Sequence, residues 1–302
     1  MSTFIHLQTI PDLLKFFRLD QSVRHPLIAI VDFSQVQEEI NGVTRLSADF
    51  YSLILKNYNR NNVRYGRKLV DFTNGSLICM APNQIIEMDS DTEAPAEMSG
   101  WGLFFHPDLI RATFLHDKMS EYSFFSYEMS EALHISEKEK QVLYNAVQKI
   151  EAELQENIDV YSQGIIVSGI EMLLNYCARF YGRQFITRKQ SNNTVVAQIG
   201  KLLGDYFKRD DIAERGLPTV KYLAEQVYLS PGYLSDLLKK ETGKNTQEQI
   251  HFYLIEEAKN ILLNTNQSVG EIAYRLGFEY PQYFNKLFKQ KTGKTPVEFR
   301  NM

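Results

Sequence analysis

Residues 277–300 read GFEYPQYFNKLFKQKTGKTPVEFR, and this stretch predicts a helix with two different sides. Phe284 and Phe288 are four residues apart, so a helix places them on one side, which we expect to be buried. Four polar residues fall mostly on the other side: Gln282, Asn285, Lys286 and Lys289. The helix also has three lysines and no acidic residue between positions 281 and 291. A basic outward side of this kind is typical of a helix that meets phosphates.

The same pattern occurs a second time in the chain. Residues 220–244 match residues 269–294 at an offset of 49 before a predicted turn and 50 after it. Two copies at a period near 50 indicate an internal duplication rather than a solenoid. In the second copy, Gly277 suits a backbone turn with a positive φ. We therefore predict two helix-turn-helix units, at about 219–241 and 268–291.

The second helix of each unit begins near a proline, and its outward side is free to enter a DNA major groove ~12 Å wide. Gln and Asn side chains can read adenine edges, and Lys can approach guanine or a phosphate. The candidate DNA-binding residues are Ser235, Asp236, Lys239 and Lys240 in the first unit, and Gln282, Asn285, Lys286 and Lys289 in the second. We expect Lys239 and Lys240 to favour phosphates. Because Gly232 has no side chain, the first unit is expected to supply less specificity.

These residues resemble a known family signature. The pattern is Ala273-x3-Gly277-Phe278-x4-Tyr283-Phe284-x3-Phe288-Lys289-x3-Gly293-x-Thr295-Pro296-x2-Phe299-Arg300. It closely resembles the C-terminal signature of AraC/XylS-type transcription regulators, over roughly residues 193–302. The resemblance implies seven helices that hold two helix-turn-helix units joined by a long helix at about 247–264. Two reading helices would then enter successive major-groove segments one helical turn, ~34 Å, apart.

The N-terminal part has the pattern of a β-rich domain. Short apolar runs rich in Val, Ile and aromatic residues predict strands at 27–33, 50–56, 68–72, 76–82 and 101–105. Their close spacing favours a small barrel or sandwich.

Two stretches, 75–84 and 100–110, resemble the cupin-type sensor and dimerisation domain of the same family. The resemblance implies an effector inside a barrel. Tyr51 and Trp101 are the candidate pocket residues, although packing is the commoner role of such aromatic residues.

Helical signals follow the strands. Ser136 and Glu139 form a predicted capping box at the start of one helix, and a second helix is predicted at about 159–181. Residues 182–193 are polar and lack periodicity, so they are the predicted linker. Thr246 to Gln249 are predicted to cap the long helix. The fold class is therefore α+β: a cupin-like domain with two flanking helices at 1–181, and an all-α DNA-binding domain at 194–302.

Composition limits the alternatives. The net charge is −4, but it is distributed as −6 over residues 1–192 and +2 over residues 193–302, which hints at a polyanion partner for the C-terminal part. Cys79 and Cys177 stand in apolar surroundings and are expected to be buried thiols in a reducing compartment. The start of the chain lacks the order of a signal peptide, and no apolar run reaches the ~18 residues of a membrane span. We expect a cytoplasmic protein.

The sequence offers no catalytic motif and no metal-binding cluster such as HExxH. We therefore expect no metal, no cofactor and no enzymatic activity. The expected partners are double-stranded DNA and a small-molecule effector, with RNA polymerase as a further candidate partner and no membrane. A homodimer is expected, with the helices at 136–181 in or near its contact. Two alternatives remain open: a cupin-type metalloenzyme with a helical accessory domain, and a constitutive DNA-architectural protein.

Overall fold

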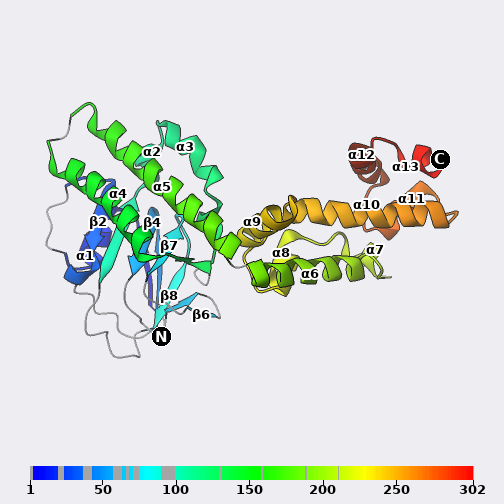
Figure 1. The fold of residues 1–302 in the computed structure, drawn as a ribbon, viewed down its shortest axis with the longest axis horizontal. Helices are drawn as coiled ribbons and strands as arrows, with labels where there is room; N and C mark the ends of the chain where they lie inside the picture. The colour runs from blue at the N-terminus through cyan, green and yellow to red at the C-terminus, as the bar shows by residue number, and fades with distance from the viewer. Residues whose placement is uncertain are drawn as a thin grey trace. The chain divides into compact units, whose positions relative to one another are not determined.

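The computed structural model divides the chain into two compact units, Met1–Thr187 and Arg188–Met302 (Figure 1). It describes residues 3–19, 24–36, 43–56, 63–65, 68–70, 75–89, 99–128, 131–157, 159–187, 189–209 and 211–301. The N-terminal unit combines sheets with helices, and the C-terminal unit is helical. The α+β fold class is therefore confirmed.

The described strands of the N-terminal unit form two five-stranded sheets. Sheet one has the order β1 (Thr3–Leu7), β3 (Val43–Ala48), β8 (Ile86–Asp89), β5 (Val63–Tyr65), β6 (Lys68–Val70). Sheet two has the order β10 (Leu133–His134), β7 (Ser76–Met80), β4 (Tyr51–Lys56), β9 (Gly100–Phe105), β2 (Ile28–Asp32). Only β1 and β3 pair in parallel among the described strands. No ladder between described residues joins the two sheets into a closed barrel.

All five predicted strands are present, although residues 71 and 72 of one prediction lie outside the described residues. Successive side chains along each strand of sheet two point to opposite faces, and both faces of this sheet are buried. Towards sheet one, Ala29, Val31 and Phe104 join a core that also includes Leu13 and Leu14 of α1 (Ile10–Phe16).

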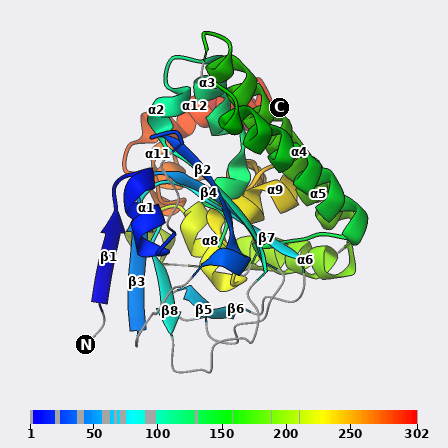
Figure 2. The same ribbon diagram turned by 90° about the vertical axis from the view of Figure 1, so that its left-hand side faces the viewer.

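The opposite face of sheet two lies beneath two long helices, α4 (Glu137–Gln155) and α5 (Ser162–Thr187), which pack along one another (Figure 2). Leu53, Leu77 and Leu103 of this face are fully buried. Cys79 of β7 and Cys177 of α5 are both buried free thiols, as predicted. Burial, and then the neighbouring Cys177 thiol, raises the pKa of Cys79, so this thiol stays protonated at neutral pH. Two further short α-helices of this unit are α2 (Pro107–Ile110) and α3 (Phe114–Lys118).

The predicted linker is helical in the structure. Helix α5 continues to Thr187, and α6 begins at Lys189, so the boundary between the units falls inside the predicted range 182–193. Two polar residues at the start of this range, Arg183 and Gln184, have partners in the N-terminal unit, so polarity was no sign of a linker there. Gln184 is buried, and its side-chain oxygen accepts from the His134 amide at 2.9 Å. Arg183 contacts Glu139 at 2.7 Å, the same glutamate that completes the predicted capping box of Ser136.

The described residues of the C-terminal unit form eight helices, one more than the resemblance implies. They are α6 (Lys189–Tyr206), α7 (Ile212–Arg215), α8 (Val220–Gln226), α9 (Pro231–Thr242), α10 (Thr246–Asn264), α11 (Val269–Arg275), α12 (Pro281–Thr292) and α13 (Pro296–Arg300). The pairs α8–α9 and α11–α12 are the two predicted helix-turn-helix units, and α10 joins them. The cap of α10 was predicted one residue too late. Asn245 is the N-cap and shares its capping box with Glu248, because the helix already begins at Thr246.

The two turns are related but differ in length by one residue, as predicted. Four residues, 227–230, separate α8 from α9, and five, 276–280, separate α11 from α12. At equivalent positions, Tyr228 has a φ of 58° and Gly277 a φ of 86°. The left-handed conformation is thus kept in both copies, although only one of them uses glycine for it.

We expect Gly277→Ala to destabilise the C-terminal unit by about 1–3 kcal/mol, because a left-handed alanine is strained. A Cβ at this position would also lie 2.9 Å from the carbonyl carbon of Gly216. Tyr228→Ala is the matched control, since Tyr228 already carries a Cβ in this conformation and its side chain is 76% exposed. Urea unfolding, monitored by the helical circular dichroism signal, measures the stability of both variants. Equal losses in the two variants would contradict the assignment of strain to Gly277.

We expect Phe288→Ala to cost about 3–5 kcal/mol of unfolding free energy, the usual range for a buried phenylalanine. Phe288 is fully buried, and its ring centroid lies 5.6 Å from that of Phe284 and 5.5 Å from that of Phe299. Tyr283→Ala on the same helix is the control, because Tyr283 is 60% exposed. Thermal melting of the full chain compares the two. A Phe288 variant that melts like the Tyr283 variant would show that the buried side is misassigned.

Candidate nucleic-acid interface

Helix α12 has the two sides that the sequence predicts. Phe284 and Phe288 are completely buried, with Pro281 in the first turn and Gly293 at the C-cap, where φ is 78°. The four predicted contact residues on the opposite side are all exposed: Gln282, Asn285, Lys286 and Lys289. The division of this helix into a buried and an exposed side is thus confirmed. Contact of the exposed side with DNA stays a prediction.

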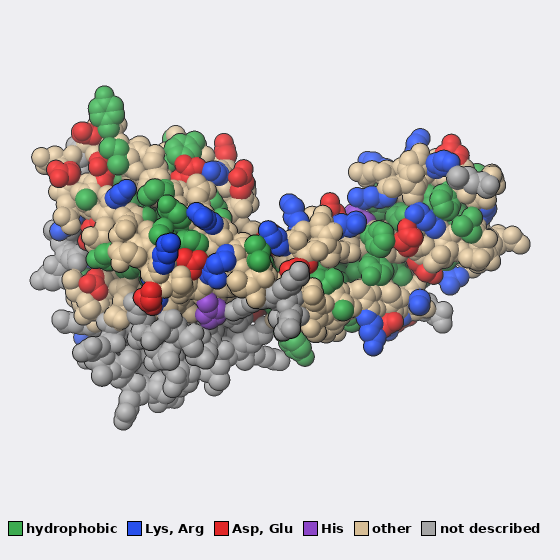
Figure 3. Space-filling model, in the orientation of Figure 1, with side chains coloured by type: hydrophobic (Ala, Val, Ile, Leu, Met, Phe, Trp, Pro, Cys, Tyr) green, Lys and Arg blue, Asp and Glu red, His purple; other side chains and the backbone are tan. Residues whose placement is uncertain are grey.

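The exposed side of α12 is basic. In Figure 3, Lys and Arg side chains gather over the part of the C-terminal unit that contains α12. Among the described residues, no ion pair involves Lys286 or Lys289. Nearby, burial lowers the pKa of His251 on α10, and the charge of Lys291 lowers it further. His251 is therefore neutral at pH 7, and the positive charge of this surface comes from lysines.

Helix α9 presents a different surface. Ser235 and Asp236 are only half exposed, whereas Lys239 and Lys240 are exposed in the last turn. The Ser235 hydroxyl donates to Oγ1 of Thr246 at 3.0 Å, and this bond ties α9 to the start of α10. A hydroxyl that is already donating inside the domain has less capacity for a base edge. The structure thus places the lysines, rather than Ser235, outermost on this helix.

One aromatic residue of α12 lies outside the core. Tyr283 is 60% exposed, whereas its counterpart Tyr233 in the first copy is buried. Tyr280, rather than a serine, is the N-cap of α12, and Tyr280 is exposed as well. The rings of Tyr280 and Tyr283 lie 6.0 Å apart. Sequence spacing alone did not distinguish Tyr283 from Tyr233.

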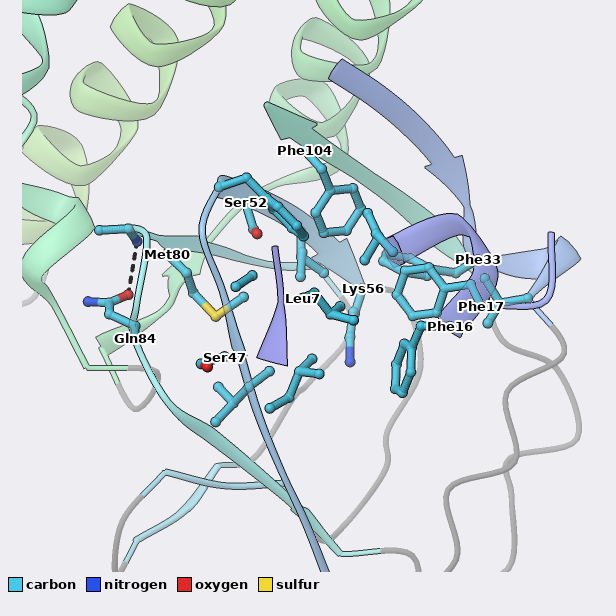
Figure 4. Close-up of a pocket in the computed structure, with 18 residues that line it drawn as sticks. Leu7, Phe16, Phe17, Phe33, Ser47, Ser52, Lys56, Met80, Gln84 and Phe104 are labelled. Carbon is cyan, nitrogen blue, oxygen red and sulfur yellow. Dashed lines mark hydrogen bonds between the residues drawn. The ribbon is translucent and has the colours of Figure 1, made fainter. Parts of the chain in front are cut away.

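The N-terminal unit contains a cavity of about 80 Å³ between sheet one, sheet two and α1. Figure 4 shows a group of phenylalanines on one side of it and Ser47, Met80 and Gln84 on the other, with Lys56 between them. The Ser47 hydroxyl lies 2.7 Å from Nδ1 of His6, whose Nε2 is 3.3 Å from Asp49. A short polar chain therefore runs from a buried serine to two partly exposed residues.

Tyr51 and Trp101 do not line this cavity. Ser52, Ile54 and Lys56 of β4 face it, so the alternate residue Tyr51 points to the helix-facing side of sheet two. There its ring stacks on Phe105 at 5.1 Å. Trp101, which is paired with Leu55, lies on that same side and borders a different groove beside α4. The expectation that both residues face the interior between the sheets is therefore wrong.

The sequence contained a signal for the cavity. Ser52 and Lys56 are polar residues in an otherwise apolar strand. They lie an even number of positions apart, so both point to the same face of the sheet. Within the described ranges, no group of three or more His, Cys, Asp or Glu side chains is arranged to hold a metal ion. None of the described helices has both the length and the apolar character needed to cross a membrane.

Comparison with known proteins decides the nature of the C-terminal unit. A family model described as "Helix-turn-helix domain" matches residues 223–302. The HTH-type transcriptional regulator YobQ of Bacillus subtilis is 37% identical over 83 residues, which are 28% of this chain and 34% of that protein. The C-terminal unit is an AraC-type helix-turn-helix domain.

Two further relatives match this chain over a limited length. The bifunctional transcriptional activator/DNA repair enzyme AdaA of Bacillus subtilis is 38% identical over 84 residues, 28% of this chain and 40% of that protein. The HTH-type transcriptional regulator YijO of Escherichia coli is 31% identical over 133 residues, 43% of this chain and 44% of that protein. The chain thus spans less than half the length of these relatives. The matches to YobQ and AdaA are shorter than the C-terminal unit, whereas the match to YijO is longer than that unit.

We expect the double variant Lys239→Ala, Lys240→Ala to weaken binding of the full chain to any DNA duplex. If both lysines contact phosphates, the variant should release about two fewer counterions on binding. The slope of log K against log salt concentration should then become less steep, by about 0.9 for each lost phosphate contact. Fluorescence anisotropy over a series of salt concentrations measures this slope. Lys138→Ala, an exposed lysine of α4 in the other unit, is the control. An unchanged slope in the double variant would exclude phosphate contacts by these two residues.

Proposed function

We propose that this chain is a sequence-specific regulator of transcription that binds double-stranded DNA and responds to a small molecule through its N-terminal unit. The observation that carries the proposal is the exposed side of α12 within an AraC-type domain. It combines two amides with lysines, and Phe284 and Phe288 on the opposite side hold it in a fixed orientation. The comparisons favour a regulator over a cupin-type metalloenzyme.

The two helix-turn-helix units of the C-terminal domain have different roles in this proposal. Gln282 and Asn285 each offer an amide with one acceptor and two donors, which matches the major-groove edge of adenine. Lys286 lies beside them and suits guanine or a phosphate. In the first unit, Lys239 and Lys240 carry the exposed charge, so α9 mainly positions the domain on the backbone. Specificity therefore comes mostly from α12.

The N-terminal unit is proposed to be an open, cupin-like sensor. Its two sheets enclose the cavity of Figure 4, where apolar walls surround the polar residues Ser47, Ser52 and Lys56. Such a lining suits a ligand with an apolar body and one polar group. A ligand regulates only if it binds two arrangements of the protein with different affinity. Exposed apolar residues on α4 and α5, among them Tyr144, Ile165 and Ile186, support a homodimer through these helices.

The test is a selection of genomic DNA fragments with the purified full chain, run in parallel with Lys286→Ala. We expect a compact motif that covers two successive major-groove segments, bound at least ~10³-fold more tightly than random duplex. Lys286→Ala should weaken binding to that motif by about 1–3 kcal/mol if Lys286 touches a base. Lys138→Ala, which removes the same charge from the other unit, should bind as the unchanged protein does.

Two outcomes would contradict the proposal. Equal affinity for the selected fragments and for random duplex would indicate a DNA-architectural protein. An absence of enrichment, both for the purified chain and after addition of cell extract that supplies small molecules, would indicate that the two helix-turn-helix units do not read DNA.

A further inference from the structure

A second hollow lies on the opposite side of sheet two from the cavity between the sheets. It is a groove of about 510 Å³ between the edge formed by β2, β4 and β9 and the helix α4. Trp101 of β9 and Asp32 of β2 line the sheet side. They are paired directly across the two strands, so both side chains belong to the same face. Tyr144, Gln148 and other polar residues of α4 line the facing wall.

Trp101, one of the residues that line this groove, carries an unmet hydrogen-bond donor. Its side chain is only 7% exposed, and its indole Nε1 has no hydrogen-bond partner among the described residues. A buried donor without a partner is destabilising, and buried indole N–H groups usually find one. The backbone of Trp101 is held between two strands, where it pairs with Asp32 of β2 and with Leu55 of β4.

The facing wall is polar, and three of its six polar lining residues are uncharged. The Gln148 side chain donates to the Tyr144 hydroxyl at 3.0 Å, which leaves the Gln148 carbonyl and the tyrosine proton available. One turn earlier, Gln141 donates to Asn145 at 2.8 Å. Lys140, the cation in this wall, pairs with Glu137 at 2.6 Å. The wall thus presents amide and hydroxyl groups that can both donate and accept.

The groups around the groove disfavour two classes of ligand. The carboxylates of Asp32, Glu137 and Glu151 line it, and Lys140 is already paired with Glu137, so an anion would be repelled. A simple cation would suit the carboxylates but would leave the Trp101 donor unmet, because a cation has no acceptor to offer. Hydroxyl groups accept from the indole and also donate to carboxylates and amide oxygens.

We propose that this groove binds a neutral polyhydroxylated molecule, a saccharide or polyol, with one of its oxygens accepting from Nε1 of Trp101. The nitrogen has no contact with solvent in the structure. A wall side chain must therefore move aside as the ligand enters, and the half-exposed Tyr144 and exposed Gln141 of α4 are long enough to do so. This site is separate from the cavity between the sheets and does not depend on the DNA-binding proposal.

The sequence provides a selective probe, because Trp101 is the only tryptophan in the chain. Titration of the full chain with a panel of glucose, maltose, glycerol and myo-inositol, up to millimolar concentrations, should give a saturable change in tryptophan emission with at least one member. Citrate and spermidine, an anion and a cation, should give none. Calorimetry then measures the affinity for the responding compound.

Variants separate the groove from other sites. Trp101→Phe keeps an aromatic ring and removes the donor, so affinity by calorimetry should fall about tenfold, which corresponds to ~1.4 kcal/mol. Tyr144→Phe should weaken binding by a smaller factor. Two controls should leave it unchanged: Tyr161→Phe, an exposed tyrosine outside the groove, and Ser52→Ala in the cavity between the sheets.

Three results would overturn the proposal. The first is no saturable emission change with any member of the panel. The second is equal affinity of Trp101→Phe and the unchanged chain. The third is a loss of binding with Ser52→Ala but not with Trp101→Phe, which would place the ligand between the sheets. None of these results bears on whether the AraC-type domain binds DNA.

Discussion

The complete burial of Phe284 and Phe288 is the constraint on which the surface of the C-terminal unit depends. An α-helix has 3.6 residues per turn, so two buried positions four residues apart determine which other positions face outward. Phe299 of α13 packs against Phe288, and this contact holds the end of the chain to the same core. The amides and lysines of α12 are therefore arranged by apolar packing behind them. A reading surface needs such support, because a side chain placed on a mobile element loses its geometric selectivity.

The duplication shows how one scaffold carries two different surfaces. Both copies keep the left-handed turn residue, the proline in the first turn and the buried positions of the second helix. They differ at other positions of the second helix. Tyr233 is buried and Tyr283 exposed, and the serine hydroxyl of α9 is engaged with Thr246. Backbone requirements thus constrain the copies to one shape, whereas the outward residues are free to differ.

The C-terminal unit could be predicted closely from the sequence because its determinants are local. The signals for its helices are the apolar periodicity, the N-cap serines and the prolines, which act over three or four residues. The internal repeat presents these signals twice. The N-terminal unit was predicted less completely. Strands such as β1 and β3 are short and depend on partners distant in the chain, which local patterns do not reveal. The linker was misread for a related reason: Gln184 and Arg183 are polar, but their partners, His134 and Glu139, lie about fifty and forty-four residues away.

Sheet two explains why the candidate pocket residues were the hardest to predict. Both of its faces are buried, so an apolar strand does not say which face lines a cavity and which meets a helix. Lys56 and Trp101 nevertheless depend on the same two strands, since β4 and β9 pair from Tyr51↔Phe105 to Lys56↔Gly100. A molecule that shifts these strands from the cavity side must alter the groove side as well. If each site binds a ligand, linkage requires that the effect of the first on the second equal the effect of the second on the first.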